Sequence, residues 1–410
     1  MKTLIKSFFF LSCLFLVAEP LPASQEEASV SLFIDLQTIE MNKEKAENGN
    51  IELQETIAQL LSMADKKLTA GPYSVVFSKE NSPVGNIHDY CSMSPYWWPD
   101  STKEDGLPYI RKDGLVNPRR FDYDKPQSSN FRDVADLLTL AYLYTGDKKY
   151  SQKVIELIRI WFIDEATRMN PNMNYAQFVP GRSTGRNFGI IESRVFMYVM
   201  DDALALCQKG EMNKEMYHAL LEWCEEFLLW LRTSEFGQKE HNSKNNHGTW
   251  YDTQTMGFSV LVGDMEVQKI LSDEFVKLRI NGHVLMNGEQ PKELTRTRAF
   301  SYSNFNLSAM MEFYLLAVRD DVLSNKDAKK LKKGILRAAK YVYSYALEPE
   351  TWPHQQLNSF NGGRMLLAQT YFTLYKLMPN KGYYQKAMSI PLDMESRSML
   401  MLKNDFFKEK

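Results

Sequence analysis

From residue 128 onward, apolar side chains recur at helical spacing in one segment after another. The first of these segments, 128–145, ends at Gly146, and glycine commonly terminates a helix. Further helices are expected at 51–68, 150–161, 189–208, 213–233, 253–263, 265–283, 304–319, 326–347 and 362–378. The sequence has no alternating strand pattern of any length. It therefore predicts an all-α fold in which helical hairpins form an incomplete α/α toroid with long loops, because about ten helices exceed what one flat bundle organises around its core.

The N-terminal residues have the layout of a secretory signal peptide. Lys2 and Lys6 precede an apolar run at 7–18, which is too short for a comfortable membrane span. Small residues then offer a cleavage region, so we expect a secreted, periplasmic protein with no membrane segment after the signal is removed. The expected parts are a signal peptide at 1–24, a polar lead-in at 25–48 and a single toroidal domain at 49–400.

The overall charge argues against a general binder of polyanions. With 49 Lys and Arg against 51 Asp and Glu, the formal net charge is -2, whereas nucleic-acid and anionic-membrane binders usually carry a basic field. We therefore expect no nucleic-acid partner. If the partner is an acidic polymer, the positive charge must be concentrated in a local groove.

A long segment at 71–127 has no sustained periodicity and is rich in proline, glycine, aspartate and tyrosine. Loops of this length in a compact chain are usually functional or disordered. This one carries Tyr96, Trp97 and Trp98, and aromatic rings of this kind can stack on sugar rings. Core packing is the more common role of any single ring, but three together in a loop favour an ordered, functional segment.

Three polar islands interrupt the helical pattern, at 181–194, 240–251 and 293–302. Between them they supply an amide, an imidazole, a guanidinium and a phenol: Asn246, His247, Arg296 and Tyr302. Each of these residues also has an ordinary structural explanation, such as a helix cap for the asparagine or a solvated face for the arginine. Spacing alone leaves both interpretations open, because Tyr302 follows Arg296 by six residues rather than four.

The four groups match the needs of β-elimination next to a sugar carboxylate. Removing the weakly acidic proton at C5 builds negative charge on the carboxylate, and each preorganised donor or cation stabilises it by roughly 3–4 kcal/mol. An amide beside an imidazole suits this neutralisation, and a guanidinium clamps a carboxylate with two hydrogen bonds. A tyrosine whose pKa is lowered by a nearby Arg or His can act as base, acid or both. This chemistry needs no metal and no cofactor.

Two strings together make a more specific pattern: Tyr96-Trp97-Trp98-Pro99-Asp100 and Asn245-Asn246-His247-Gly248. With Gly185-Arg186 in the first island, and Arg296 and Tyr302 in the third, this order of motifs resembles the alginate lyase superfamily of polysaccharide lyases. The resemblance covers residues 75–375. It implies an α/α toroid that cleaves an acidic uronan by β-elimination, with mannuronate-rich alginate or glucuronan as the substrate.

The resemblance also implies a role for each matching residue. Asn246 would neutralise the substrate carboxylate, and His247 would act beside it as a second neutralising group or as the base. Tyr302 would act as acid and also as base, and Arg296 would hold the carboxylate or lower the pKa of the tyrosine. Glu240 would orient His247 or Arg296. Contacts with the sugar chain are expected from Glu240, Tyr96, Trp97, Trp98, Arg182, Arg186, Asn187, Trp250 and Tyr251.

Two other interpretations stay open at the level of sequence. A glycoside hydrolase acting on uronic sugars needs two carboxylates in acid and base or nucleophile roles, and the candidates are Glu192, Glu240 and Asp252. A non-catalytic acidic-glycan-binding protein needs aromatic and arginine side chains, but not both His247 and Tyr302. Elimination leaves a C4–C5 double bond that absorbs ultraviolet light, so the products distinguish the lyase from both alternatives.

Overall fold

The computed structural model describes residues 31–78, 80 and 85–406, so the expected signal peptide at 1–24 lies outside the described residues. The longer helices are α1 (Leu36–Glu47), α2 (Ile51–Lys67), α3 (Asp124–Thr145), α4 (Lys148–Phe162), α5 (Arg194–Gln208), α6 (Lys214–Thr233), α8 (Asn246–Val262), α9 (Met265–Phe275), α12 (Ala299–Arg319), α13 (Asn325–Leu347) and α14 (Asn361–Leu377). The shorter helices are α7 (Glu235–His241), α10 (Asn281–His283), α11 (Pro291–Leu294), α15 (Lys381–Ser389) and α16 (Met394–Lys403). Single turns and one π-helical segment are η1 (Val75–Phe77), η2 (Pro118–Asp122), η3 (Asn187–Ser193), η4 (Val276–Ile280) and η5 (Pro349–Thr351).

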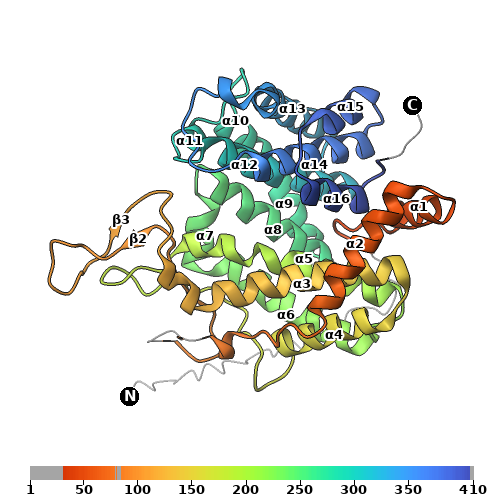
Figure 1. Cartoon of the computed structure of the whole chain (residues 1–410). Coiled ribbons are helices and arrows are strands. Elements are labelled where there is room, and N and C mark those ends of the chain that lie inside the picture. The colour runs from red at the N-terminus through yellow and green to blue at the C-terminus, as the bar shows by residue number, and fades with distance from the viewer. Residues whose placement is uncertain (1–30, 79, 81–84, 407–410) are drawn as a thin grey trace, which may run out of the picture. The chain divides into compact units, whose positions relative to one another are not determined.

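The long helices are arranged as hairpins in two layers, with the first helix of each hairpin in the inner layer and the second helix in the outer layer (Figure 1). In each hairpin one helix contacts the next: α3 with α4, α5 with α6, α8 with α9, α12 with α13 and α14 with α15. The first members also contact one another in chain order, α3 with α5, α5 with α8, α8 with α12 and α12 with α14. These first members form the inner layer, and α8 is the most completely buried of them. The arrangement is the expected incomplete α/α toroid.

The two ends of the inner layer are joined through the terminal helices. Helix α14 contacts α16, α16 contacts α2, and α2 contacts α3. Helix α1 occupies 36–47 within the segment expected to be a polar lead-in at 25–48, where the sequence predicted no helix. Asp35 caps α1, Ile39 and Ala46 are buried, and Asn42 donates hydrogen bonds to carbonyl oxygens at the end of α16. The helix has few apolar residues, and its buried face is held by contacts with segments that are distant in sequence.

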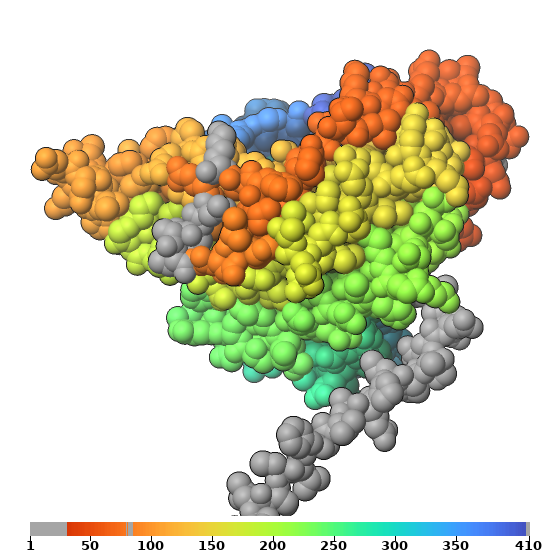
Figure 2. All heavy atoms as spheres, turned by 90° about the horizontal axis from the view of Figure 1, so that it is seen from below, coloured from red at the N-terminus to blue at the C-terminus, as the bar shows by residue number. Residues whose placement is uncertain are grey.

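Four short strands order the long loop. Strand β1 (Cys91–Met93) pairs in parallel with β4 (Tyr175–Phe178), and β2 (Trp97–Trp98) pairs antiparallel with β3 (Ile110–Arg111). The β2–β3 hairpin projects beyond the helices on the side of α7 (Figure 1). The space-filling view shows it in orange beside the yellow-green chain around residue 180 (Figure 2). The N–H of Tyr109 donates to the carbonyl of Pro180 at 3.1 Å, which joins these two segments.

The described residues contain neither a helix that could span a membrane nor a cluster of metal-binding side chains. Within 31–78, 80 and 85–406, no helix has both the length and the apolar character that a bilayer crossing requires. In the same residues, histidine, cysteine and carboxylate side chains do not gather in threes at a place that could hold a metal ion.

Candidate active site

The second polar island folds into the corner between α7 and α8. Asn245 caps α8, and its side chain accepts a hydrogen bond from the N–H of His247 at 3.2 Å. Arg279 holds the corner from η4, donating to the carbonyl oxygens of His241 at 2.6 Å and Ser243 at 3.1 Å. A buried ion pair with Asp252, at 2.7 Å, fixes Arg279 in turn. The corner therefore places the next two residues, at the N-terminus of α8, with little freedom.

His247 is oriented by a buried carboxylate. Its Nδ1 lies 2.6 Å from Oε1 of Glu240, which is fully buried, and Asn187 donates to the other carboxylate oxygen at 2.7 Å. The ring edge of Phe188 packs against the imidazole with centroids 4.9 Å apart. When the Nδ1–H of a neutral His247 donates a hydrogen bond to Glu240, Nε2 carries the lone pair of the ring. No described residue forms a hydrogen bond with Nε2. The imidazole can therefore take up a proton.

The hydroxyl of Tyr302 lies between the guanidinium of Arg296 and the phenol of Tyr96. It accepts a hydrogen bond from Arg296 at 2.9 Å and lies 3.0 Å from the hydroxyl of Tyr96. The guanidinium of Arg296 stands 3.8 Å from the ring centroid. Burial, followed by the effect of Tyr96, raises the pKa of Tyr302 more than Arg296 lowers it. Arg296 thus acts on this pKa in the expected direction, but burial outweighs it, and Tyr302 carries its proton in the unliganded site.

Arg296 is held by a carboxylate from the long loop. Asp113 accepts hydrogen bonds from Arg296 at 3.1 and 3.3 Å and from Thr297 at 3.1 Å, and it also pairs with Arg111. Burial would raise the pKa of Asp113, but hydrogen bonds and charge from Arg296 and Arg111 lower it to about 2. The ion pair therefore persists at neutral pH and directs the guanidinium at Tyr302.

Asn246 joins the second and third islands. Its backbone N–H and its Nδ2 each donate to Glu293, both at 2.7 Å. Both side chains are buried, and burial raises the pKa of Glu293, while hydrogen bonds from Asn246 and the charges of Arg296 and His247 act in the opposite direction. Glu293 thus lies within electrostatic range of both His247 and Arg296. The side chain of Asn246 is fully buried in the unliganded protein.

The first island and the aromatic loop complete the site. Trp97 lies near two guanidiniums, with Arg182 5.1 Å and Arg186 5.6 Å from its ring centroid. Arg186 also stands 4.6 Å from the ring of Phe188, which touches His247. Trp98 is 5.6 Å from the ammonium of Lys112 and donates its indole N–H to a loop carbonyl at 3.0 Å. Aromatic faces and cations therefore alternate next to the His247 and Tyr302 groups.

This site lies within a segment that matches a known family. Residues 76–352 of 410 match the family described as Alginate lyase. The chain belongs to the alginate lyase family. It is therefore a polysaccharide lyase.

Solved structures agree with this assignment. An alginate lyase from Bacteroides ovatus matches 92% of this chain and 100% of its own, with 29% identity and a TM-score of 0.84. Alginate lyase A1-III from Sphingomonas species A1 matches 92% of this chain and 97% of its own, with 14% identity and a TM-score of 0.53, and this likeness shows the fold alone. These neighbours confirm the all-α toroid. No curated protein matches the sequence.

Two predicted sugar contacts of this polysaccharide lyase are wrong. Trp250 is 2% exposed and packs on Phe305 with ring centroids 4.9 Å apart. Tyr251 is 5% exposed and donates its hydroxyl proton to the carbonyl of Leu231 at 2.9 Å. Both follow the motif by only a few residues, but on α8 their side chains pack against Phe305 and the end of α6 and do not face solvent.

Three residues of the site were not predicted. Glu293 precedes Arg296 by three residues within a polar island, and that position was a usable signal. Asp113 offered no signal, because its partner Arg296 is distant in sequence. Phe188 offered none, because it contributes only a ring contact with His247.

The carboxylates considered for a hydrolase are already engaged. Glu192 accepts hydrogen bonds from Tyr90 at 3.0 Å and Ser92 at 2.6 Å. Asp252 is paired with Arg279, and Glu240 with His247. The structure therefore offers no facing pair among these three that is free to act as acid and base.

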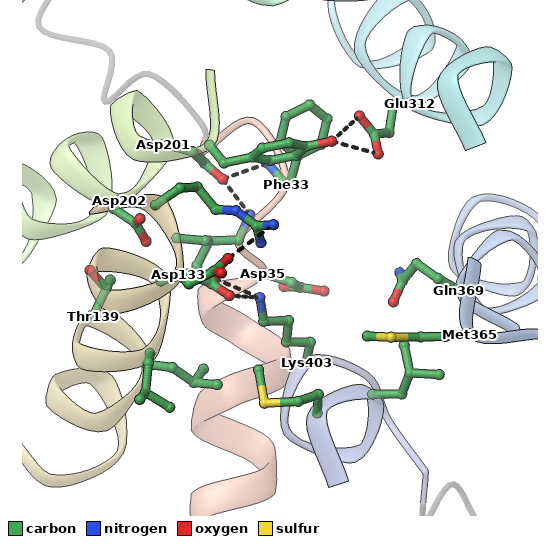
Figure 3. Close-up of a pocket in the computed structure, with 18 of the residues that line it drawn as sticks. Phe33, Asp35, Asp133, Thr139, Asp201, Asp202, Glu312, Met365, Gln369 and Lys403 are labelled. Carbon is green, nitrogen blue, oxygen red and sulfur yellow. Dashed lines mark hydrogen bonds and ion pairs between the residues drawn. The ribbon is translucent and has the colours of Figure 1, made fainter. Parts of the chain in front are cut away.

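A cavity of about 670 Å³ lies apart from the candidate catalytic residues, and none of them lines it. Its walls come from α1, α2, α3, α5, α12, α14 and α16, and the close-up shows the carboxylates of Asp201, Asp202 and Glu312 around it (Figure 3). Asp201 accepts backbone N–H groups from residues 32–34, and Glu312 accepts the hydroxyl of Tyr198. Burial raises the pKa of Asp201 to about 6 and that of Glu312 to about 7.

Proposed function

We propose that this polysaccharide lyase cleaves an acidic uronan, either mannuronate-rich alginate or glucuronan, by β-elimination. The observation that carries the proposal is the arrangement of two preorganised pairs, Glu240 with His247 and Arg296 with Tyr302, that both lie within electrostatic range of Glu293. One pair contains an imidazole with an available lone pair, and the other contains a protonated phenol. These are the base and the acid that elimination requires.

The proposed reaction assigns one step to each group. Nε2 of His247 removes the C5 proton, and the electrons of the C–H bond form the C4–C5 double bond. The C4–O bond breaks, and Tyr302 donates its phenolic proton to the leaving oxygen. Asn246 and Arg296 stabilise the charge that develops on the substrate carboxylate, and Trp97 with Arg182 and Arg186 contacts neighbouring sugars. The proton on His247 then returns to Tyr302 through solvent.

A panel of uronans tests this function. Polymannuronate, polyguluronate and glucuronan are incubated separately with the purified protein, and ultraviolet absorbance and reducing ends are followed together. We expect both signals to rise in parallel on polymannuronate or glucuronan. Reducing ends without ultraviolet absorbance would support the hydrolase instead, and binding with neither signal would support the non-catalytic glycan binder.

Replacing Tyr302 tests the assignment of the acid. Tyr302→Phe keeps the ring but has no proton to donate, so we expect kcat to fall by about 10³-fold while affinity for the uronan is retained. Tyr343→Phe, on α13 and hydrogen-bonded only to Ser389 among the described residues, removes the same atom elsewhere and should retain turnover. Undiminished product formation in Tyr302→Phe would remove this residue from the mechanism.

We also propose that the protein is exported to the periplasm with residues 1–24 removed. The charged start and short apolar run of the sequence support this. Cell fractionation and the N-terminal sequence of the mature protein test it, and an uncleaved cytoplasmic product would contradict it.

A further inference from the structure

The Asn246 amide presents its two polar atoms to different surroundings. Its Nδ2 donates to Oε2 of Glu293 at 2.7 Å, and its Oδ1 is buried without a hydrogen-bond partner among the described residues. The role proposed for Asn246 requires the opposite orientation, because a free carbonyl oxygen repels a carboxylate and an amide N–H attracts it. In the present orientation, the second hydrogen on Nδ2 could reach the substrate carboxylate only if the same nitrogen also kept its hydrogen bond to Glu293. The two carboxylates would then lie side by side.

A half-turn of the amide exchanges Oδ1 and Nδ2 and leaves the shape of the side chain unchanged. After the exchange, Oδ1 faces Oε2 of Glu293, and two acceptors at this separation repel each other. A proton on Oε2 removes the conflict, since the carboxylic acid then donates to Oδ1. The other Glu293 oxygen can still accept the backbone N–H of Asn246, which lies 2.7 Å away.

We infer that Glu293 carries a proton in the substrate complex, and that this proton turns the Asn246 nitrogen toward the substrate carboxylate. Glu293 is then a positioning residue, and the inference rests on the proposed function. Burial already raises the pKa of Glu293 in the unliganded protein. The charged and titratable groups acting on it are Arg296, on the turn after α11, and His247, on α8, and both oppose this shift. A substrate carboxylate against Asn246 adds a negative charge and raises the pKa further.

The pH dependence of kcat tests the inference with two variants. Glu293→Gln mimics the protonated acid, because its amide oxygen accepts the backbone N–H and its amide nitrogen donates to Oδ1 of Asn246. We expect Glu293→Gln to lose less than about tenfold in kcat and Glu293→Ala to lose about a hundredfold. In the wild type the contribution of Glu293 is present below its pKa and is lost as the pH rises through it. Glu293→Gln should lack this alkaline loss.

Glu226→Gln, an exposed substitution on α6, is the matched control and should follow the wild-type profile. If Glu293→Gln is as inactive as Glu293→Ala, or if it keeps the wild-type alkaline limb, the inference is overturned. Activity of the wild type on the uronan panel is measured alongside, so that a failure of the proposed function is recognised separately.

A spectroscopic measurement decides the protonation without turnover. A protonated carboxyl group has an infrared carbonyl band that a carboxylate lacks, and the difference between wild type and Glu293→Gln isolates the Glu293 signal. We expect this band to persist to a higher pH than for an ordinary glutamate, and to strengthen when a uronan oligosaccharide binds the Tyr302→Phe variant. Titration in the ordinary glutamate range in both states would refute the inference.

Discussion

Glu240 is the residue on which the orientation of His247 depends most directly. It is fully buried, and its Oε1 lies 2.6 Å from Nδ1 of the imidazole. We predict that Glu240→Gln lowers kcat by about 10³-fold, because an amide can donate to Nδ1 and thereby favour the tautomer whose Nε2 carries the proton. Steady-state kinetics on the preferred uronan measure the effect, and KM should change little.

Asn187→Ala provides the comparison for this variant. It removes the shorter of two hydrogen bonds to Oε2 of Glu240, from Nδ2 at 2.7 Å, and leaves the longer bond from Ser243 at 3.4 Å and the contact of Glu240 with His247. We expect a loss of about tenfold at most. Equal losses in the two variants would mean that Glu240 acts through general packing and not through the tautomer of His247.

Local motifs indicated some residues of the site but not the contacts that fix them. Asn246 and His247 are adjacent, and the structure places them together at the start of α8. Arg296 and Tyr302 meet in spite of their six-residue spacing, because the chain turns between α11 and α12 and helical periodicity does not apply there. Asp113 could not be predicted, since it lies 183 residues from Arg296 and an ion pair leaves no periodic signal.

At the scale of elements, most long helices followed from sequence, but α8 begins seven residues before the expected 253–263 and α12 begins five residues before the expected 304–319. The expected segments 213–233, 326–347 and 362–378 agree with α6, α13 and α14 to within one residue at each end. Their hydrophobic stripes pack on neighbours that are close in the chain. Helices α1 and α16 contact each other although they are far apart in sequence. The strands β1, β2 and β3 of the long loop and their partner strand β4 are only two to four residues long. None of these elements therefore carries a local pattern strong enough to detect.

The α7–α8 corner leaves no room for a side chain at Gly248. A Cβ atom there would lie 2.1 Å from the carbonyl oxygen of Ser243 and 2.7 Å from the guanidinium of Arg279. We predict that Gly248→Ala destabilises the protein by about 1–3 kcal/mol and lowers kcat, because the start of α8 must shift away from the corner. Thermal unfolding and kinetics are measured together.

Gly362→Ala is the matched control for this element. It lies in the first turn of α14, and a Cβ atom there meets nothing within 4 Å. Alanine should stabilise the helix by about 0.5–1 kcal/mol and leave turnover intact. If Gly248→Ala is equally harmless, the close contact between the corner and α8 does not hold the catalytic residues in place.

At the scale of the whole molecule, the cavity between the inner and terminal helices carries acids whose pKa is raised by burial. Besides Asp201 and Glu312, it contains Asp202, whose pKa is raised well above its ordinary value by burial and by the charge of Asp136, against the effect of Lys403. An acid that binds its proton more tightly in the folded state stabilises the fold below the unfolded pKa of about 4. It loses this contribution as the pH rises through the folded pKa.

Asp202 offers the clearest test of this pH dependence. It is 1% exposed, and its Oδ2 has no hydrogen-bond partner among the described residues, so the opposing effect of Lys403 does not offset the cost of burying the charge on ionisation. We predict that Asp202→Asn is stabilised relative to the wild type, and that the difference grows by up to about 1.4 kcal/mol per pH unit above the unfolded pKa. Urea unfolding at pH 5, 6, 7 and 8, values chosen to span roughly the window of the raised carboxyl groups, measures this difference.

Gln369→Ala, which changes a non-ionisable residue of the same cavity, should shift stability equally at every pH. A constant difference for Asp202→Asn as well would mean that Asp202 is a solvent-screened carboxylate and not a buried acid.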